Sequence, residues 1–221
     1  MSILAIDTSL QACSVAASPM QGGDDAIAFK SHRIGVGHAE HLAPMVQSVL
    51  AEVQLKASDV KRILVTVGPG SFMGVRVGIS FAKGLAMAHG ALSIPITTLD
   101  ALWLNAPMNA DGFALIDAKR GQVYVQGFGA VAAEGRLLDY ETARSLVMGE
   151  GLTLIGSGVA AILPTHQKLE PPENSKDGHE LHVPDVKKLV REARRRDPAA
   201  LLPSYLRAPD AAPAKAAQKQ A

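Results

Sequence analysis

Two aspartates close short apolar runs of the sequence, and both could take part in phosphate chemistry. Asp7 is followed by Thr8 and Ser9, and Asp117 ends a similar run in the second half of the chain. A carboxylate at the end of a strand can hold a hydrated cation while the amides of the next turn hold a phosphate. Asp7 and Asp117 facing each other across a cleft would therefore predict nucleotide chemistry. The alternative is that both carboxylates only cap their own turns.

The turns beside the two aspartates differ from those of working phosphate sites. The layout resembles that of actin-like and sugar-kinase-like ATPases, which place glycine at the second turn position to admit a phosphate, whereas Thr8 stands there in this chain. Beside Asp117, residues 119–121 replace the small residues of those enzymes. We therefore expect Asp7, Thr8, Ser9 and Asp117 to form a vestigial phosphate-binding site. The alternative is an actin-like-fold small-molecule kinase or ATPase that uses Asp7 and Asp117.

Other side chains with reactive chemistry give weaker signals. His38 and His41 are one helical turn apart, but two ligands are too few for a metal site, and no third ligand stands at a suitable spacing. Cys13 lies in an apolar run, which predicts a buried and unreactive thiol. Ser71 lies in a glycine turn that lacks the Gly-x-Ser-x-Gly spacing of a nucleophile elbow. We therefore expect neither catalytic residues nor metal ligands in this chain.

A basic helix is predicted near the end of the chain. Asp185 is a candidate N-cap for a helix that continues through Arg196, and its apolar positions follow the helical period. The polar face is rich in lysine and arginine, namely Lys187, Lys188, Arg191, Arg194, Arg195 and Arg196. Such a face is usually solvated, and without interleaved aromatic residues it gives little support for specific RNA recognition. A supporting contact to phosphate groups is the alternative.

The composition excludes several classes of protein. The chain has 221 residues, of which 48% are hydrophobic and 19% charged, as is typical of one or two globular domains. A net charge of +1 does not indicate a polyanionic partner. The chain has one cysteine, no basic N-terminal region and no long apolar run. We therefore expect a soluble cytoplasmic protein without a signal peptide or a membrane span.

The elements that must position these residues occur twice. Residues 2–7 and 113–117 are apolar runs that end in aspartate, and each is followed by a turn and a returning run. Residues 63–67 and 152–155 are apolar runs that lead into glycine turns. The repeated order of elements predicts an internal duplication.

This duplication predicts the fold class and the domain boundaries. Hairpins beside crossover units give an α/β fold with two similar lobes, in which mixed sheets are flanked by helices. We expect an N-terminal lobe at 1–101, a C-terminal lobe at 102–210 and a disordered tail at 211–221.

Two amphipathic helices are predicted in the first half. Residues 38–53 carry an apolar stripe at helical spacing, and a second helix at 74–89 follows the first glycine turn. One face of the second helix holds only small residues, namely Gly74, Gly78, Ala82 and Ala86. Because glycine inside a helix costs roughly 1 kcal/mol relative to alanine, we expect a close backbone approach that compensates for it.

Several motifs, spread over most of the chain and in a fixed order, resemble the TsaB family, also called YeaZ. They are residues 6–9 with 13–16, the helix start 38–44, the glycine turn 68–78, the second hairpin 117–124 and the C-terminal segment 203–210. Within the glycine turn, Met73 stands where threonine is usual in the family.

The resemblance implies both a fold and a role. It implies two lobes of the actin, Hsp70 and sugar-kinase (ribonuclease H-like) type. It also implies a part in the bacterial synthesis of threonylcarbamoyladenosine in tRNA, as a subunit that binds and activates the TsaD-type catalytic subunit together with the TsaE-type ATPase. ATP and magnesium would then be used by the complex, this chain alone would bind no cofactor, and tRNA would be reached only indirectly.

The sequence lacks the metal-binding histidine pair of the catalytic paralogue, which agrees with an accessory role. The catalytic paralogue binds its metal through a His-x-x-x-His pair, and the corresponding run of this chain, residues 94–103, holds no histidine. We therefore expect a subunit that is not an enzyme. A peptidase, an activity historically attached to the wider family, is the least supported interpretation, because neither a metal pair nor a serine triad is indicated.

The resemblance implies that the two predicted helices form an interface with another protein. They would form a helix bundle with the same helices of a partner, or of a second copy when the partner is missing. The predicted interface residues lie along both helices and are His38, His41, Leu42, Met45, Val46, Val49, Val75, Gly78, Ile79 and Ala82. The alternative is that both helices use these residues to cover their own sheet.

Overall fold

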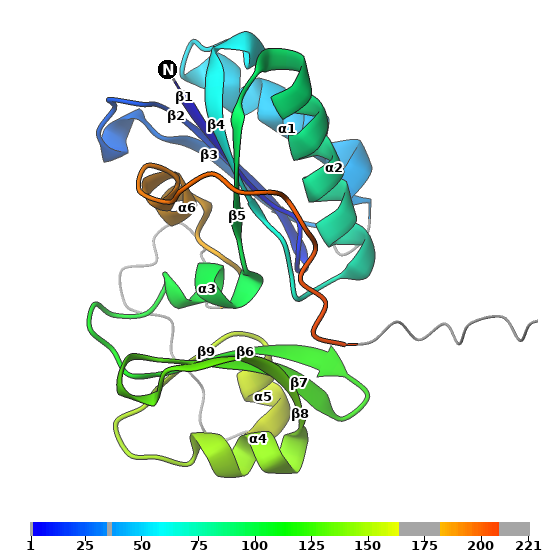
Figure 1. Ribbon diagram of the computed structural model, residues 1–221, viewed down its shortest axis with the longest axis vertical. Helices are drawn as coiled ribbons and strands as arrows, with labels where there is room; N and C mark the ends of the chain where they lie inside the picture. Colours follow the sequence, from blue (N-terminus) through cyan, green and yellow to red (C-terminus); the bar gives the residue numbers. More distant parts are fainter. Residues whose placement is uncertain (1, 35–36, 164–181, 208–221) are drawn as a thin grey trace, which may run out of the picture.

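The computed structural model describes residues 2–34, 37–163 and 182–207. Within these ranges, two mixed β-sheets lie one above the other with helices on their faces (Figure 1). This arrangement confirms the predicted α/β fold class.

The first sheet contains strands β1 to β5. Their bounds are β1 Ser2–Asp7, β2 Ala12–Pro19, β3 Ala28–Arg33, β4 Val60–Thr66 and β5 Leu92–Ile96. The strand order is β3-β2-β1-β4-β5, with antiparallel pairs on one side of β1 and parallel pairs on the other. Every residue of β1 is buried, which requires that both faces of the sheet be covered.

The second sheet repeats this plan. Its strands are β6 Gly112–Lys119, β7 Gln122–Phe128, β8 Ala133–Asp139 and β9 Thr153–Ile155. The order β8-β7-β6-β9 has the same pairing directions as the first four strands of the other sheet, which confirms the predicted similarity of the two lobes. Strand β8 was not expected, because its alternation is weak and most of its residues are exposed or half-buried.

The helices fall into groups that cover particular faces. Their bounds are α1 His38–Glu52, α2 Phe72–His89, α3 Thr98–Trp103, α4 Tyr140–Val147, α5 Gly158–Ile162 and α6 Val186–Ala193, with short 3₁₀ turns at Asp24–Ala26, Ala57–Asp59 and Gly129–Val131. Helices α1 and α2 pack on one face of the first sheet, whereas α6 packs on the other (Figure 1). Helix α3 lies between the two sheets, since Ala101 packs with the first and Leu99 with the second.

The expected helix boundaries agree closely with the structure. Helices were predicted at 38–53 and 74–89, and they are found at 38–52 and 72–89. Ser71 caps α2 by accepting a hydrogen bond from the backbone of Gly74 at 3.2 Å. Asp185 caps α6 in the predicted way, since its side chain accepts from the backbone of Lys187 at 2.9 Å.

The predicted boundary of the C-terminal lobe is wrong for the last part of the chain. Helix α6 comes after the second sheet in sequence, but its buried residues pack on the first sheet. Arg62 of β4 donates to the carbonyl groups of Ala193 and Arg196, and the backbone of Ser204 donates to Val67 at 2.7 Å. The first lobe therefore includes the segment from α6 to Ser204. The predicted tail at 211–221 lies outside the described residues.

The described helices were also compared with the dimensions of a lipid bilayer. None of them combines the length and the apolar character that crossing a membrane requires.

Candidate functional site

A cavity of about 690 Å³ lies between the two lobes. The first lobe contributes Ser9, Arg33 and Ser71 to its lining, and the second contributes Asp117 and Ser157, among others. A volume of this size is typical of small-molecule sites. The predicted cleft therefore exists, with two of the predicted phosphate-site residues, Ser9 and Asp117, in its lining.

Asp7 does not lie in this cavity. Its side chain is fully buried, and Oδ1 accepts hydrogen bonds from the Ser9 backbone at 3.0 Å, from Ser9 Oγ at 2.6 Å and from Thr66 Oγ1 at 2.7 Å. Oδ2 is buried without a hydrogen-bond partner among the described residues. Burial raises the pKa of Asp7, and the hydrogen bonds from Ser9 and Thr66 only partly oppose it. The prediction that Asp7 faces Asp117 across the cleft is wrong, because Asp7 closes its own turn.

The glycines at the start of α2 explain why this turn is closed. A Cβ atom on Gly74 would lie 2.0 Å from the carbonyl oxygen of Thr8, and one on Gly70 would lie 2.2 Å from that of Ser9. The side chain of Thr8, itself buried, donates to the carbonyl of Gly74 at 2.7 Å, and the Ser71 backbone donates to Ser9 at 2.7 Å. The expected close approach thus takes place between α2 and the turn of its own lobe.

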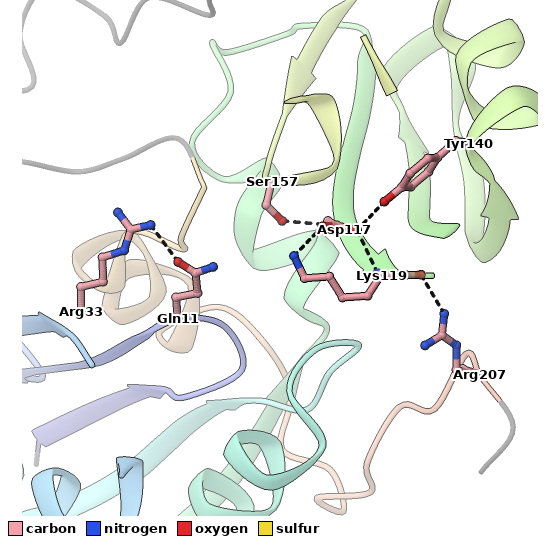
Figure 2. Close-up of polar contacts among 7 residues, drawn as sticks. All are labelled: Gln11, Arg33, Asp117, Lys119, Tyr140, Ser157 and Arg207. Carbon is pink, nitrogen blue, oxygen red and sulfur yellow. Dashed lines mark hydrogen bonds and ion pairs between the residues drawn. The ribbon is translucent and has the colours of Figure 1, made fainter. Parts of the chain in front are cut away.

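Asp117 is held by neighbours from its own lobe (Figure 2). Its carboxylate accepts from Lys119 Nζ at 2.7 Å, from the Lys119 backbone at 2.8 Å and from the Tyr140 hydroxyl at 3.0 Å. Its backbone donates to Ser157 Oγ at 3.1 Å. Burial by itself would raise the pKa of Asp117, but the hydrogen bonds from Lys119 and Tyr140 outweigh it and lower the pKa. The same bond to Asp117 raises the pKa of Lys119.

The histidines and the cysteine behave as structural residues. His38 is buried, and its Nε2 lies 3.1 Å from the carbonyl oxygen of Leu10, whereas His41 is exposed. Across the described ranges, no group of three or more His, Cys, Asp or Glu side chains is arranged to hold a metal ion. Cys13 is buried as predicted, and burial raises the pKa of its thiol to about 12.

The predicted partner residues are not available on the surface. Of the set given above for the two helices, every member except His41 is buried in this chain. The apolar side chains of α1 and α2 in that set join one cluster with the first sheet. For every member except His41, the prediction that these residues are accessible to a partner is therefore wrong, because each helix has one core-facing stripe and that stripe packs on the sheet. Gly78 is needed for a similar reason, since a Cβ there would lie 2.5 Å from Thr8 Oγ1.

The basic helix is largely engaged within the chain. Arg191 makes two bonds of 2.7 Å to the carboxylate of Asp24, and Arg194 donates to the carbonyl of Gly22 at 2.7 Å. Lys188 donates to the carbonyl of Leu104 at 2.7 Å, and Arg196 pairs with Glu192 at 3.0 Å. The contacts of Lys188, Arg191 and Arg194 hold α6 against the first lobe, whereas Arg196 pairs within its own segment, so the phosphate-contact alternative gains no support.

Several polar residues of the cavity and of its border were not singled out from the sequence. Gln11, Arg33, Tyr140 and Ser157 lie on different elements, and nothing in their local sequence marks them as neighbours. Arg207 lies in the C-terminal segment 203–210, which carries part of the family resemblance, so the sequence motif could have identified this residue. Only the tertiary structure brings these residues to one cavity and its border.

The buried carboxyl of Asp7 gives a pH-dependent prediction. Because its folded pKa is raised, the stability that the protonated form contributes is present below the ordinary value of 3.8 and is lost as the pH rises through the raised pKa. An Asp7→Asn variant lacks this titration. Urea denaturation at several pH values compares the two proteins. Between pH 4 and pH 8, we expect the wild type to lose stability relative to the variant, so the difference in the free energy of unfolding, variant minus wild type, increases with pH. A difference that falls with pH would contradict the burial argument.

Comparison with known proteins places the chain in a family. The family model of tRNA N6-adenosine threonylcarbamoyltransferase (TsaD) matches residues 35–148. The tRNA threonylcarbamoyladenosine biosynthesis protein TsaB of Escherichia coli (strain K12) is 35% identical over 127 residues, which are 56% of this chain and 53% of that protein. An uncharacterized protein of Mycobacterium tuberculosis (strain ATCC 25618 / H37Rv) is 31% identical over 216 residues, 96% of this chain and 94% of its own length.

A solved structure agrees with the sequence relatives. YeaZ from Pseudomonas aeruginosa superposes with a TM-score of 0.67 at 26% identity, covering 93% of this chain and 99% of that one. The chain spans about half the length of the curated TsaB proteins that it matches. Family model, relatives and fold agree with the sequence motifs, and the chain therefore belongs to the TsaB (YeaZ) family.

Proposed function

We propose that this chain is a non-catalytic subunit in the synthesis of threonylcarbamoyladenosine in tRNA. It binds a TsaD-type catalytic subunit and, with a TsaE-type ATPase, supports threonylcarbamoyl transfer. ATP and magnesium are used by the complex, and tRNA is contacted through it. The observation that carries the proposal is that both strand-end aspartates are engaged by the chain's own side chains.

The geometry of the cleft favours this proposal over a kinase or ATPase. Holding magnesium and a nucleotide takes exposed carboxylates and backbone donors directed at the phosphates. Asp7 is buried, the Ser71 amide bonds to Ser9, and Asp117 already pairs with an ammonium group. The run 94–103 also lacks the histidine pair of the catalytic paralogue. These residues fit a structural role better than phosphoryl transfer.

The outward faces of α1 and α2 are the surface that suits a partner. On α2, Phe72 is 50% exposed, Met73 is 66% exposed and Met87 is 87% exposed, so this side of the helix offers apolar contacts. The charged residues exposed on α2, Arg76 and Lys83, are both basic. Apart from the exposed His41, the residues predicted from the sequence lie beneath this surface, so we place the interface on the outward side of the same helices.

The same faces suit a second copy when the partner is missing. Glu52 of α1 already pairs with Lys30 at 3.2 Å, so the exposed Glu40 is the carboxylate of α1 that complements the basic face of α2 in another molecule. A two-fold axis would satisfy both contacts at once. We therefore include a homodimer of the isolated chain in the proposal.

A reconstituted reaction tests the proposed function. The mixture contains the TsaD-type and TsaE-type proteins, ATP, magnesium, the threonylcarbamoyl donor and tRNA, and modified adenosine is measured with and without this chain. We expect modification to require the chain, and the chain alone to transfer nothing. Full modification without it would overturn the proposal.

A matched pair of variants tests the surface. Met87→Glu places a charge on the outward face of α2, and we expect it to weaken binding of the TsaD-type subunit about tenfold or more, because an interface core excludes charge. Met108→Glu makes the same change at a residue that is 91% exposed and lies outside both helices. Its affinity should stay within about twofold of the wild type. Equal effects of the two variants would contradict the proposed surface.

A further inference from the structure

The buried cores of the two lobes are largely separate within the described part of the chain. In the two clusters on the first sheet, the buried residues belong to that lobe, except for Ala101 of α3. The clusters on the second sheet add other residues of α3 and the flanking side chains of Leu10 and Leu206. Lobes joined by so little apolar contact are expected to move relative to each other. The contacts that do join them therefore decide how far the cavity between them opens.

Helix α3 is one connection between the lobes. Toward the first lobe, the backbone of Thr98 donates to the carbonyl of Gly68 at 2.8 Å. Toward the second lobe, Trp103 stacks on Phe128 of β7, with the ring centroids 4.6 Å apart and the ring planes 5° from parallel. Changes in the angle between two lobes are usually absorbed by a few residues at the ends of such an element. The ends of α3 therefore have the position of a hinge.

A second connection is a segment of four residues, 204–207, which we call the strap. The backbone of Ser204 donates to the carbonyl of Val67 at 2.7 Å, in the first lobe. Only two residues later, Leu206 packs against a cluster of the second lobe. In Figure 1 this part of the chain runs from beside α2 toward the second sheet. The strap therefore crosses the boundary between the lobes directly.

The end of the strap is bound beside the cavity. Arg207 Nη2 donates to Gln122 Oε1 at 2.7 Å and to the carbonyl of Lys119 at 3.4 Å, both at the turn between β6 and β7 (Figure 2). Arg207 and Lys119 also line the cavity. Gln122 and Phe128 are the two ends of β7, so the strap and α3 hold this strand at points roughly 20 Å apart. Two attachments at that separation fix the angle between the lobes, whereas one would leave it free.

The middle of the strap lies on the exposed start of α2. Arg76 Nε donates to the hydroxyl of Tyr205 at 3.1 Å, and the rings of Phe72 and Tyr205 have centroids 5.8 Å apart. The guanidinium carbon of Arg76 also lies 3.6 Å from the centroid of the Phe72 ring. All three side chains are exposed. Adjacent parts of one short segment thus contact the outward side of α2 and the lining of the cavity.

We propose that the strap holds the two lobes at their present separation, with α3 as the hinge, and that release of Arg207 opens the cavity. Arg207 and Tyr205 are the positioning residues, because one binds the second lobe and the other binds the first. This device goes beyond the proposed subunit function, and it operates in the chain without a partner protein.

The distance between two spin labels, one on each lobe, tests the proposal in the full chain. The labels are attached at Gln21→Cys, in the exposed turn after β2, and at Ser145→Cys, on the exposed side of α4. Cys13 is buried, so the labels react at the two new cysteines. Labelled protein is diluted with unlabelled protein, and pulsed electron paramagnetic resonance then measures distances within one molecule.

Arg207→Gln is expected to increase the population with the longer distance. Its share should rise about fivefold or more relative to the unchanged strap, the factor that corresponds to loss of a hydrogen bond from a charged donor. Combining Tyr205→Ala with Arg207→Gln removes both attachments and should increase this share further. Arg195→Gln makes the same change in charge at an exposed residue outside the strap and should leave the distance distribution unchanged.

Hydrogen exchange of β1 and β6 separates opening of the lobes from loss of structure. We expect the protection of both strands to equal that of the wild type in every variant, because the strap pairs with neither strand. Three results would each overturn the proposal. They are an unchanged distance distribution in the combined variant, an equal change in Arg195→Gln, and a longer distance that appears only together with lost protection in either sheet.

Discussion

Replacing Gly74 with alanine is expected to lower the free energy of unfolding by about 3 kcal/mol or more, or to prevent folding. The added methyl group would lie 2.0 Å from the carbonyl oxygen of Thr8, which belongs to backbone and cannot swing aside. Relief would require α2 to move away from the turn that holds Asp7. Urea denaturation, followed by far-UV circular dichroism, measures the change.

Gly84→Ala is the matched control in the same helix. A methyl group at Gly84 meets nothing within 4 Å, so the substitution only raises the helix propensity. We expect the free energy of unfolding to rise by up to about 1 kcal/mol. If both variants lose stability to the same extent, contact with the Thr8 turn is not the reason for glycine at position 74.

Leu189→Ala is expected to cost about 2–5 kcal/mol, the usual range for a large side chain removed from a core. Leu189 is fully buried and packs with Ile3, Leu64 and Ile94 in the cluster between α6 and the first sheet. The loss should appear in the unfolding of the first lobe, because α6 covers one of its faces. Amide hydrogen exchange of β1 and β4 measures where protection is lost.

The control for this variant is another leucine of the same C-terminal part. Leu202 is 68% exposed, so Leu202→Ala should change the free energy of unfolding by no more than about 0.5 kcal/mol. Loss of protection confined to the second sheet in Leu189→Ala would contradict the assignment of α6 to the first lobe.

Much of the local structure was predictable from the sequence. The apolar runs that end in Asp7 and Asp117, each followed by a turn and a returning run, predicted the two hairpins found as β1–β2 and β6–β7. The glycine turn and helical period predicted α2, and the repeated order predicted two similar sheets. These predictions succeed because alternation, helical period and turn chemistry depend on neighbours in sequence.

The cleft itself was only partly predictable. The sequence pointed to Asp7, Thr8, Ser9 and Asp117 as one phosphate-type site. In the structure Ser9 and Asp117 border the cavity, but Asp7, Thr8 and Ser9 are all fully buried, and Ser9 Oγ donates to Asp7. Whether a polar side chain faces a cavity or its own backbone depends on distant partners. For Asp7 the distant partner is Thr66, which follows it by 59 positions and adds a third bond to the two from its neighbour Ser9.

The sequence by itself determined which residues form strands and helices, which share a face, and which family they resemble. The tertiary structure alone decided that α6 returns to the first sheet, that the apolar stripes of α1 and α2 cover their own sheet, and that Arg33 and Arg207 meet at one cavity. The physical reason is that periodicity identifies an apolar face without identifying what covers it. Burial is fixed only when segments far apart in the chain pack together.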